Sequence, residues 1–484
     1  MIVILLIVLV LAILVAAMFI VSGAKKKAAL ARKPAAEALP EEDGKEVADT
    51  LAGAVRCRTV SHSDQSKVDW IEFEKLHKFL EERFPLVHSS LEHEVIGKAS
   101  LVYCWKGSDP SLEPILLTAH QDVVPEEELS RWEHGPFDGD IADGFVWGRG
   151  AFDVKIQFVA ILSAAEKLLK EGFAPKRTVY FGFGCNEEVS GDGAVLIASE
   201  FKRRGIHFHM VLDEGGAVMD RLMKQIHSHV AVVGVAEKGH LNLKLSVKKH
   251  GGHSSTPDNP TSLGILGRAL ARVEVAQMPC HLVKPMEWFF EAVGSNTSGL
   301  FSLLFSNLWL TRPLVFSAFR KNPQYAAFIR TTHAATMCSA ADAPNVVPDV
   351  SEAIVNCRLI GSDTPEDVRR WVEKTIRDKR VKVEEAGESM LQSPVSPIDC
   401  EQFDGLRAII GSVFKDTIAV PYFMSGGSDA RHYSSVSENI YRFTPAMMNF
   451  DELGRMHNYN ERLSVDNCGK ALEFYLALLA RFAG

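Results

Sequence analysis

Five short segments carry imidazole and carboxylate side chains, the ligands that a borderline cation such as zinc accepts. They are Leu116–Asp122 (LLTAHQD), Gly148–Lys155 (GRGAFDVK), Asn186–Glu188 (NEE), Leu212–Gly216 (LDEGG) and Arg455–Glu461 (RMHNYNE). Each segment alone is a weak signal, because buried histidines and adjacent acids usually have structural roles. Together they could form a dinuclear carboxylate–imidazole metal site, provided that the fold brings them to one place.

The elements expected around these segments would bring them together. Short apolar runs predict three buried strands, at 114–118, 178–183 and 209–212. Three of the segments lie at the ends of these strands, and in open α/β sheets sites assemble at the carboxyl ends of strands. In the first segment Asp122 can support the ring of His120, and in the second the glycines allow a tight turn that points Asp153 inward. This recurrence favours a metal site over a set of hydrogen-bonded core residues.

The wider pattern predicts an α/β fold in two units. From Gly239 onward, apolar and polar residues alternate as in strands with one wet face. We interpret 239–388 as a small domain of sheet and helices inserted into a larger catalytic domain, which comprises 46–238 and 389–484. The stretch 280–330, called the apolar insertion below, is unusually rich in Phe, Leu and Trp. It is either extra core for the inserted domain, or an apolar wall that binds a hydrophobic substrate or contacts a membrane.

Composition excludes several classes of protein. The chain has 484 residues, of which 46% are hydrophobic and 24% charged, so it can bury real cores. A net charge of −8 without a basic excess argues against nucleic-acid binding. The eight cysteines are scattered without a CxxC pair, which argues against a thiolate zinc site or a disulfide scaffold.

The first 21 residues contain no charged side chain, and an apolar segment of this length is long enough to cross a bilayer as a helix. We expect an uncleaved single-pass membrane anchor at 1–24 and a linker at 25–45. A cleaved signal peptide ending near Ser22–Ala24 is the alternative. The lysines at 25–27 favour a cytoplasmic flank, but long domains translocate regardless of such a bias, and the side of the membrane stays open.

As an ordered set, the motifs HQD, GRGAFDVK, NEEVSG, LDEGG, GGHSSTP, NVVP, GGSDARHY and RMHNYNER resemble the aminoacylase and carboxypeptidase S family of dinuclear zinc hydrolases. The resemblance extends from about Val47 to the C-terminus, and is strongest to the carboxypeptidase S and N-fatty-acyl-amino-acid synthase/hydrolase branches. It implies a catalytic domain with a central mixed sheet flanked by helices, and an α+β lid domain that also serves in homodimer contacts.

The resemblance also implies roles at the metal site. It gives five ligands for two zinc ions, with Co²⁺ or Mn²⁺ as substitutes: Asp153 as the bridge, His120 and Asp213 at one ion, and Glu188 and His457 at the other. Asp122 would orient His120. Glu187 would be the general base, which takes a proton from water and passes it to the leaving nitrogen.

Further residues match substrate positions of the family. His253 matches a residue that stabilises the oxyanion, often from a partner subunit, although a turn histidine would look the same. Asn345 and Arg358 match lid positions that contact substrate, with a surface strand as the alternative for Arg358. The loop at 426–429, including Gly427, and the nearby Arg431 could receive a carboxylate, or the loop is structural.

Three positions depart from the family pattern without removing a ligand. Val154 and Asn186 stand where the family often has acids, and Ala340-Ala341 replaces Ala-Gly. The leading hypothesis is hydrolysis of N-acyl amino acids, including those with long acyl chains. The alternatives are a carboxypeptidase or dipeptidase acting on small peptides, and an inactive hydrolase-fold binding protein.

Overall fold

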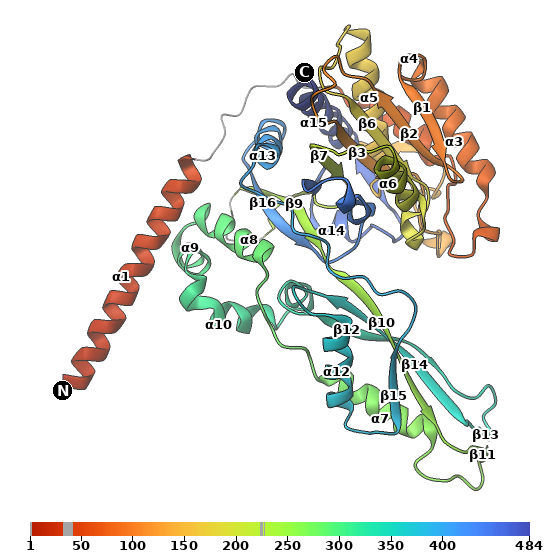
Figure 1. Ribbon diagram of the computed structural model, residues 1–484, viewed down its shortest axis with the longest axis vertical. Helices are drawn as coiled ribbons and strands as arrows, with labels where there is room; N and C mark the ends of the chain where they lie inside the picture. Colours follow the sequence, from red (N-terminus) through yellow and green to blue (C-terminus); the bar gives the residue numbers. More distant parts are fainter. Residues whose placement is uncertain (1, 32–41, 223–225, 227) are drawn as a thin grey trace.

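A computed structural model describes residues 2–31, 42–222, 226 and 228–484 of the chain. Two units stand out (Figure 1). The large unit is built on a ten-stranded sheet and the small unit on a four-stranded sheet. The first helix, α1 (Ile2–Ala31), lies beside them as a separate rod.

The ten-stranded sheet is mixed, with strand order β1-β2-β6-β3-β7-β17-β9-β8-β18 and β16 paired to β9. Its strands are β1 (Glu92–Ile96), β2 (Ser100–Trp105), β3 (Ile115–His120), β6 (Val179–Gly184), β7 (Met210–Asp213), β8 (Val218–Met219), β9 (His229–Glu237), β16 (Thr417–Met424), β17 (Ile440–Arg442) and β18 (Met447–Met448). The central strands β6, β3, β7 and β17 run parallel. The three strands expected from the apolar runs are β3, β6 and β7, so their carboxyl ends do share one edge.

Helices cover both faces of this sheet, which explains the continuous apolar runs of its central strands. From β3, Ile115 and Leu117 pack into one core cluster with the helices of one face. Leu116 points the other way, into a second cluster with the remaining helix. The first face is covered by α2 (Lys45–Val55), α5 (Lys155–Lys170), α13 (Glu401–Val413) and α15 (Val465–Ala483), and the second by α6 (Gly193–Arg203).

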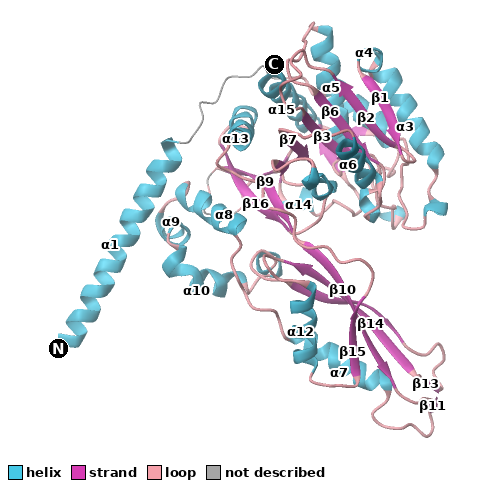
Figure 2. Ribbon diagram, viewed as in Figure 1, coloured by secondary structure: helices cyan, strands magenta, loops and turns pink. Residues whose placement is uncertain are grey.

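The small unit is an antiparallel sheet in the order β12-β14-β10-β15, covered on one face by two helices (Figure 2). The elements are β10 (Gly239–Lys248), α7 (Ser262–Val275), β12 (Thr332–Ser339), β14 (Val350–Leu359), α12 (Pro365–Ile376) and β15 (Val381–Glu385). Leu241, Leu243 and Leu245 alternate into a core of its own. A two-stranded ribbon of β11 (Gly252–His253) and β13 (Val346–Val347) forms its far tip.

The apolar insertion packs on the large unit. Its helices are α8 (Lys284–Ser295), α9 (Gly299–Ser306), α10 (Leu308–Phe319) and α11 (Pro323–Ala326). Phe290, Phe305 and Phe319 join a cluster with Val230 and Val420, which belong to β9 and β16. We expected the insertion to extend the core of the inserted domain, but it packs on the sheet of the large unit instead. Apolar composition predicts that a segment is buried, but not which surface it covers.

Helix α1 contacts α8 and α9, and it continues to Ala31, beyond the expected start of the linker at 25. Within the described residues no single helix is both long and apolar enough to cross a membrane. The pair α9 and α10, bent by 112°, does meet that criterion by length and composition. The side chains of residues 1–9 and 11, and the linker at 32–41, lie outside the described residues, so the anchor stays a prediction.

The remaining elements complete the large unit. They are α3 (Trp70–Arg83), α4 (Pro85–Ser90), α14 (Phe450–Leu453), the three-stranded sheet of β4 (Ile141–Ala142), β5 (Phe145–Trp147) and β19 (Arg462–Ser464), and the 3₁₀ helices η1 (Gln65–Lys67), η2 (Leu129–Arg131), η3 (Glu187–Val189) and η4 (Asp429–Ser435). Of these, η3 and η4 border the site described next.

Candidate metal centre

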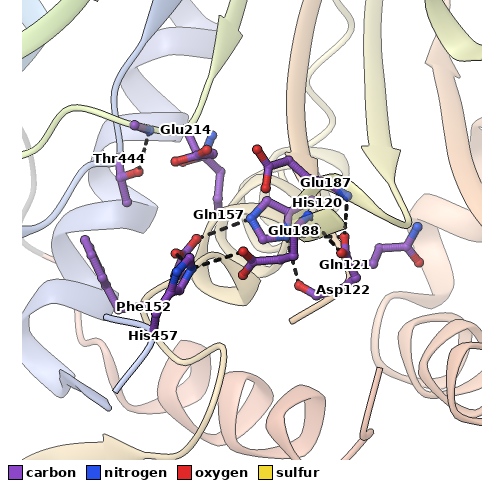
Figure 3. Close-up of polar contacts among 12 residues, drawn as sticks. His120, Gln121, Asp122, Phe152, Gln157, Glu187, Glu188, Glu214, Thr444 and His457 are labelled. Atoms are coloured by element: carbon purple, nitrogen blue, oxygen red, sulfur yellow. Dashed lines mark hydrogen bonds and ion pairs between the residues drawn. The ribbon is translucent and has the colours of Figure 1, made fainter. Parts of the chain in front are cut away.

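The structure brings the five predicted ligands to the carboxyl edge of the central strands. His120 is the last residue of β3 and Asp213 the last of β7. Glu188 follows β6 in η3, Asp153 lies just before α5, and His457 lies in the loop before β19. Figure 3 shows the side chains of His120, Glu188 and His457 converging on one point. We call these five residues the metal centre.

Asp153 lies between the two histidines, as a bridging ligand would. Its Oδ1 is 3.2 Å from His120 Nε2, and its Oδ2 is 2.9 Å from His457 Nε2. Glu188 Oε2 is 3.0 Å from the same nitrogen of His457. One potential ligand atom from each of His120, Asp153 and Glu188 lies within 4.8 Å of the others. This spacing allows the three side chains to bind a common metal ion.

Asp122 orders both sides of the centre. The Nδ1 atom of His120 is 2.9 Å from the backbone carbonyl of Asp122 and 3.5 Å from its carboxylate. The same carboxylate accepts hydrogen bonds from the backbone amides of Glu187 (3.0 Å) and Glu188 (3.1 Å). Asp122 is fully buried. It therefore fixes the imidazole and the pair of acids relative to each other.

Glu461 is a positioning residue that the sequence motifs contained without revealing its partner. It is buried, and its Oε1 accepts hydrogen bonds from the amides of Phe152 (3.0 Å) and Asp153 (3.1 Å). Its Oε2 pairs with Arg149 at 2.7 Å. The GRGAFD turn and the RMHNYNER loop are thus tied together directly behind Asp153. The sequence held one indication of this tie, because Arg149 in the first motif and Glu461 in the second carry opposite charges.

Charges are crowded in the centre, and burial shifts their pKa values. Burial raises the pKa of Asp213 to about 6 and that of Glu187 well above its usual range. Glu214 and Asp429 were not assigned roles at this centre from the sequence, and burial also raises the pKa of each carboxyl well above the usual range. Hydrogen bonds to Asp153 and Glu188 raise the pKa of His457 to about 10. Holding several buried carboxylates this close together costs free energy through desolvation and mutual repulsion. Bound cations would lower that cost.

Unpartnered oxygens test whether the residues fit such cations. Among the described residues, Glu188 Oε1, Asp213 Oδ2 and Asp429 Oδ2 are buried without a hydrogen-bond partner. Leaving a buried polar atom unsatisfied costs about 1–3 kcal/mol, and more if it is charged. The carboxylate and imidazole donors match what zinc accepts. The set therefore fits a dinuclear metal site.

The predicted substrate residues do not join the centre within this chain. His253 is exposed at the tip of the small unit, where Ser254 N donates to the carbonyl of Asn345 (3.0 Å). Arg358 lies opposite His240 in the small sheet. Arg431 is closer to the centre, but its guanidinium pairs with Glu237 at 2.9 Å.

That glutamate organises the loop around Gly427. Glu237 Oε2 also accepts from the amide of Ser428 at 2.7 Å, and its Oε1 pairs with Arg442 at 2.7 Å. All three side chains are buried. The loop is therefore tied to the end of β9, where the chain leaves for the small unit, and Arg431 already has an acidic partner.

An apolar cavity of about 340 Å³ begins at the metal centre. Asp153 and Glu214 line one end of it. The apolar insertion also contributes to the lining, with Met286, Phe289, Phe319, Gln324, Tyr325, Ala327 and Phe328. The second sequence interpretation of the insertion, an apolar wall beside the site, agrees with this placement.

The profile of peptidase family M20/M25/M40 matches residues 116–481. The chain belongs to this family. It is 38% identical to "Probable carboxypeptidase S-like 2" of Dictyostelium discoideum, over 90% of this chain and 84% of that protein. It is 37% identical to the N-fatty-acyl-amino acid synthase/hydrolase PM20D1 of Mus musculus, over 90% of this chain and 87% of that one.

Solved structures show the same fold. The M20 family metallo-carboxypeptidase Sso-CP2 from Sulfolobus solfataricus superposes with a TM-score of 0.65 at 16% identity, covering 90% of this chain and 98% of that one. The α/β architecture, a mixed central sheet with flanking helices, is that of M20 hydrolases, and the predicted family is confirmed. M20 metallopeptidases are metal-dependent, which agrees with the donor set described above.

Proposed function

We propose that this M20 hydrolase cleaves the amide bond of N-acyl amino acids with long apolar acyl chains, and that its two metal ions are zinc. The apolar cavity is the observation that carries this proposal. It starts at Asp153 and Glu214 and continues between the main sheet and the apolar insertion. A chain bound there would have its carbonyl end at the metal centre and its methyl end among Phe and Tyr side chains.

Five residues of the centre would bind the metal ions, and Glu187 would transfer the proton. His120, Asp153, Glu188, Asp213 and His457 would hold the two ions. When bound, zinc supplies polarisation of a carbonyl group and lowers the pKa of water. Burial raises the pKa of Glu187 well above its usual range, so this side chain holds a proton readily once it has accepted one. Glu187 would take the proton from the attacking water and give it to the leaving nitrogen.

His253 would act in a different subunit from its own. It is exposed at the tip of the small unit, which projects away from the large unit (Figure 1). A homodimer formed through the small unit, the lid of the family, would carry this imidazole to the partner's centre as an oxyanion donor. The predicted single-pass anchor would hold the enzyme on a membrane, where substrates with long acyl chains partition.

The names of the relatives support two substrate classes. Several are called N-fatty-acyl-amino acid synthase/hydrolase, from fish to mammals. Others are called carboxypeptidase S-like, which supports release of an amino acid from a small peptide as the second candidate. The cavity favours the first class, because a small peptide would leave its apolar walls uncovered.

A chain-length series tests the choice. The full-length protein in detergent is assayed for zinc content and for kcat/KM on N-acyl amino acids of increasing acyl length and on dipeptides. Each buried methylene contributes about 0.8 kcal/mol, which is about a fourfold rise in kcat/KM until the cavity is full. If kcat/KM did not change with acyl length and dipeptides were cleaved efficiently, the peptidase function would be favoured instead. No metal and no turnover would favour the binding protein.

A further inference from the structure

The outer face of the hairpin formed by α9 and α10 is apolar and uncovered. Leu300 is 66% exposed, Trp309 58% and Leu314 65%. Single exposed apolar side chains are common, but a cluster on one projecting element marks an interaction surface. On the opposite side of the hairpin, Phe305 and Phe319 are buried in the core of the large unit. Apart from Arg312, a half-exposed side chain that pairs with Glu287 of α8 at 3.4 Å, these helices present apolar side chains on both faces of the hairpin.

Asn307 and Thr311, two polar side chains at the bend, find hydrogen-bond partners inside the hairpin. The Nδ2 atom of Asn307 donates to the carbonyl of Leu303 (2.8 Å), and its Oδ1 accepts from Trp309 Nε1 (3.2 Å). The hydroxyl of Thr311 donates to the carbonyl of Asn307 at 3.0 Å. An element that enters lipid needs such internal partners, because hydrocarbon offers none.

Helix α1 extends the same surface. Asn307 Nδ2 also contacts the carbonyl of Met18 (3.2 Å) and the hydroxyl of Ser22 (3.0 Å), and the Ser22 side chain is buried. Lys25 and Glu291 of α8 form an ion pair at 3.0 Å. Figure 1 shows α9 beside α1 and α10 turning away from it.

The exposed side chains of α1 match those of the hairpin. Phe19 is 59% exposed and Ile20 71%, while the lysines at 25–27 follow directly in the sequence. An apolar segment that ends in a group of lysines fits the boundary between hydrocarbon and anionic headgroups. Tryptophan, with an apolar ring and a polar N–H, is enriched at the same boundary.

We propose that the α9–α10 hairpin is embedded in a lipid bilayer beside α1, with Trp309 and Leu314 in contact with acyl chains. A bilayer fits this surface better than a second protein chain, because lipid can cover both the rod of α1 and the bent hairpin at once. The inner side of α10 lines the apolar cavity through Phe319, together with Met286 and Phe289 of α8. The inference uses the proposed anchor, but it does not depend on the proposed reaction.

The test must locate the hairpin itself, since α1 alone could hold the protein on vesicles. Full-length protein is reconstituted into phosphatidylcholine vesicles with bromine atoms on the acyl chains, near the headgroups. Bromine quenches tryptophan emission only on contact. We expect quenching in the wild type, and loss of most of the quenched component in Trp309→Phe. Trp70→Phe, on α3 of the large unit, should leave the quenched component unchanged.

A rescue pair guards against an indirect effect of the substitution. In the Trp309→Phe background, Leu314→Trp should restore quenching, because position 314 is on the uncovered surface. Ile71→Trp introduces an equally exposed tryptophan (Ile71 is 61% exposed) on α3 and should not restore it. Vesicle flotation reports the anchor separately. Protein that floats with equal quenching in the wild type and Trp309→Phe overturns the hairpin proposal alone, and protein that does not float overturns both.

Discussion

The metal centre and the apolar insertion adjoin one cavity but are built in opposite ways. In the metal centre, side chains from five separate segments are fixed by short polar contacts, such as those from Asp122 and Glu461. In the insertion, consecutive helices present phenylalanine rings that are held by packing, for example Phe290 against Phe319, whose ring centroids are 5.1 Å apart. Polar contacts depend steeply on geometry, whereas apolar contacts scale with area. Substitutions should therefore have near all-or-none effects in the first region and graded effects in the second.

The largest effect is expected at Glu187. Glu187→Ala removes the proposed base but leaves its backbone amide, which is the group that Asp122 holds. We expect turnover to fall about 10²–10⁴-fold, with the zinc content unchanged. Steady-state kinetics and metal analysis measure the two quantities. Glu127→Ala, an exposed acid in the same unit, is the control and should behave as the wild type. Substantial turnover in Glu187→Ala would refute the proposed mechanism.

Glu461 should show the intermediate effect of a positioning residue. Glu461→Gln removes the charge that faces Arg149 and replaces one of the two acceptor oxygens, which serve Arg149 and the amide of Asp153, with an NH2 group that cannot accept. We expect metal affinity and kcat/KM to fall about 10–100-fold together, with a lower Tm, because the buried arginine loses its partner.

A nearby ion pair provides the control for Glu461. Glu452 pairs with Arg462 at 2.7 Å in the same part of the chain, but touches no ligand. Glu452→Gln should change stability by less than about 1 kcal/mol and leave zinc affinity unaltered. If Glu461→Gln lost stability but kept its zinc affinity, its role would be purely structural.

The two regions also differ in what the sequence could predict. The convergence of three of the five ligand segments was predictable because they follow strands, and the carboxyl ends of parallel strands meet at one edge of a sheet. The roles of the individual ligands came from the resemblance to the family. The role of Glu461 was not, because its partner Asp153 is 308 residues away and only the fold joins them. The engagement of Arg431 by Glu237 was hidden for the same reason. The insertion was predicted as apolar, but its packing on β9 and β16 depends on shape, which composition does not encode.

A graded effect is expected in the cavity wall. Phe289 is half-buried and lines the cavity, and Phe289→Ala should lower kcat/KM for long acyl chains about tenfold, because apolar contact area is lost. Short acyl chains that do not reach the wall should be unaffected. Phe301→Ala makes the same change on α9, outside the cavity lining, and serves as the control. An equal loss for short and long chains would contradict the assignment of the cavity to the acyl group.

The smallest effect, on stability alone, is expected at Lys238, a buried cation where the insertion meets the end of β9. Its ammonium donates to the carbonyl of Arg330 at 3.1 Å. Burial, together with the charge of Arg358, lowers its pKa to about 7 from an ordinary value of 10.5. Between these two pH values the unfolded chain binds more protons than the folded one, so this group makes the folded protein more stable as pH rises.

Lys238→Met should therefore raise stability most below pH 7, and its advantage should vanish as pH rises toward 10.5. Because the substitution also removes the hydrogen bond to Arg330, the net gain should be on the order of 1 kcal/mol, or about 1–2 °C in Tm for a chain of this size. Thermal unfolding at a series of pH values measures it. Lys244→Met, at a half-exposed lysine paired with Glu352, should show no such trend. A gain independent of pH would mean that improved packing, rather than relief of a buried charge, stabilises the variant.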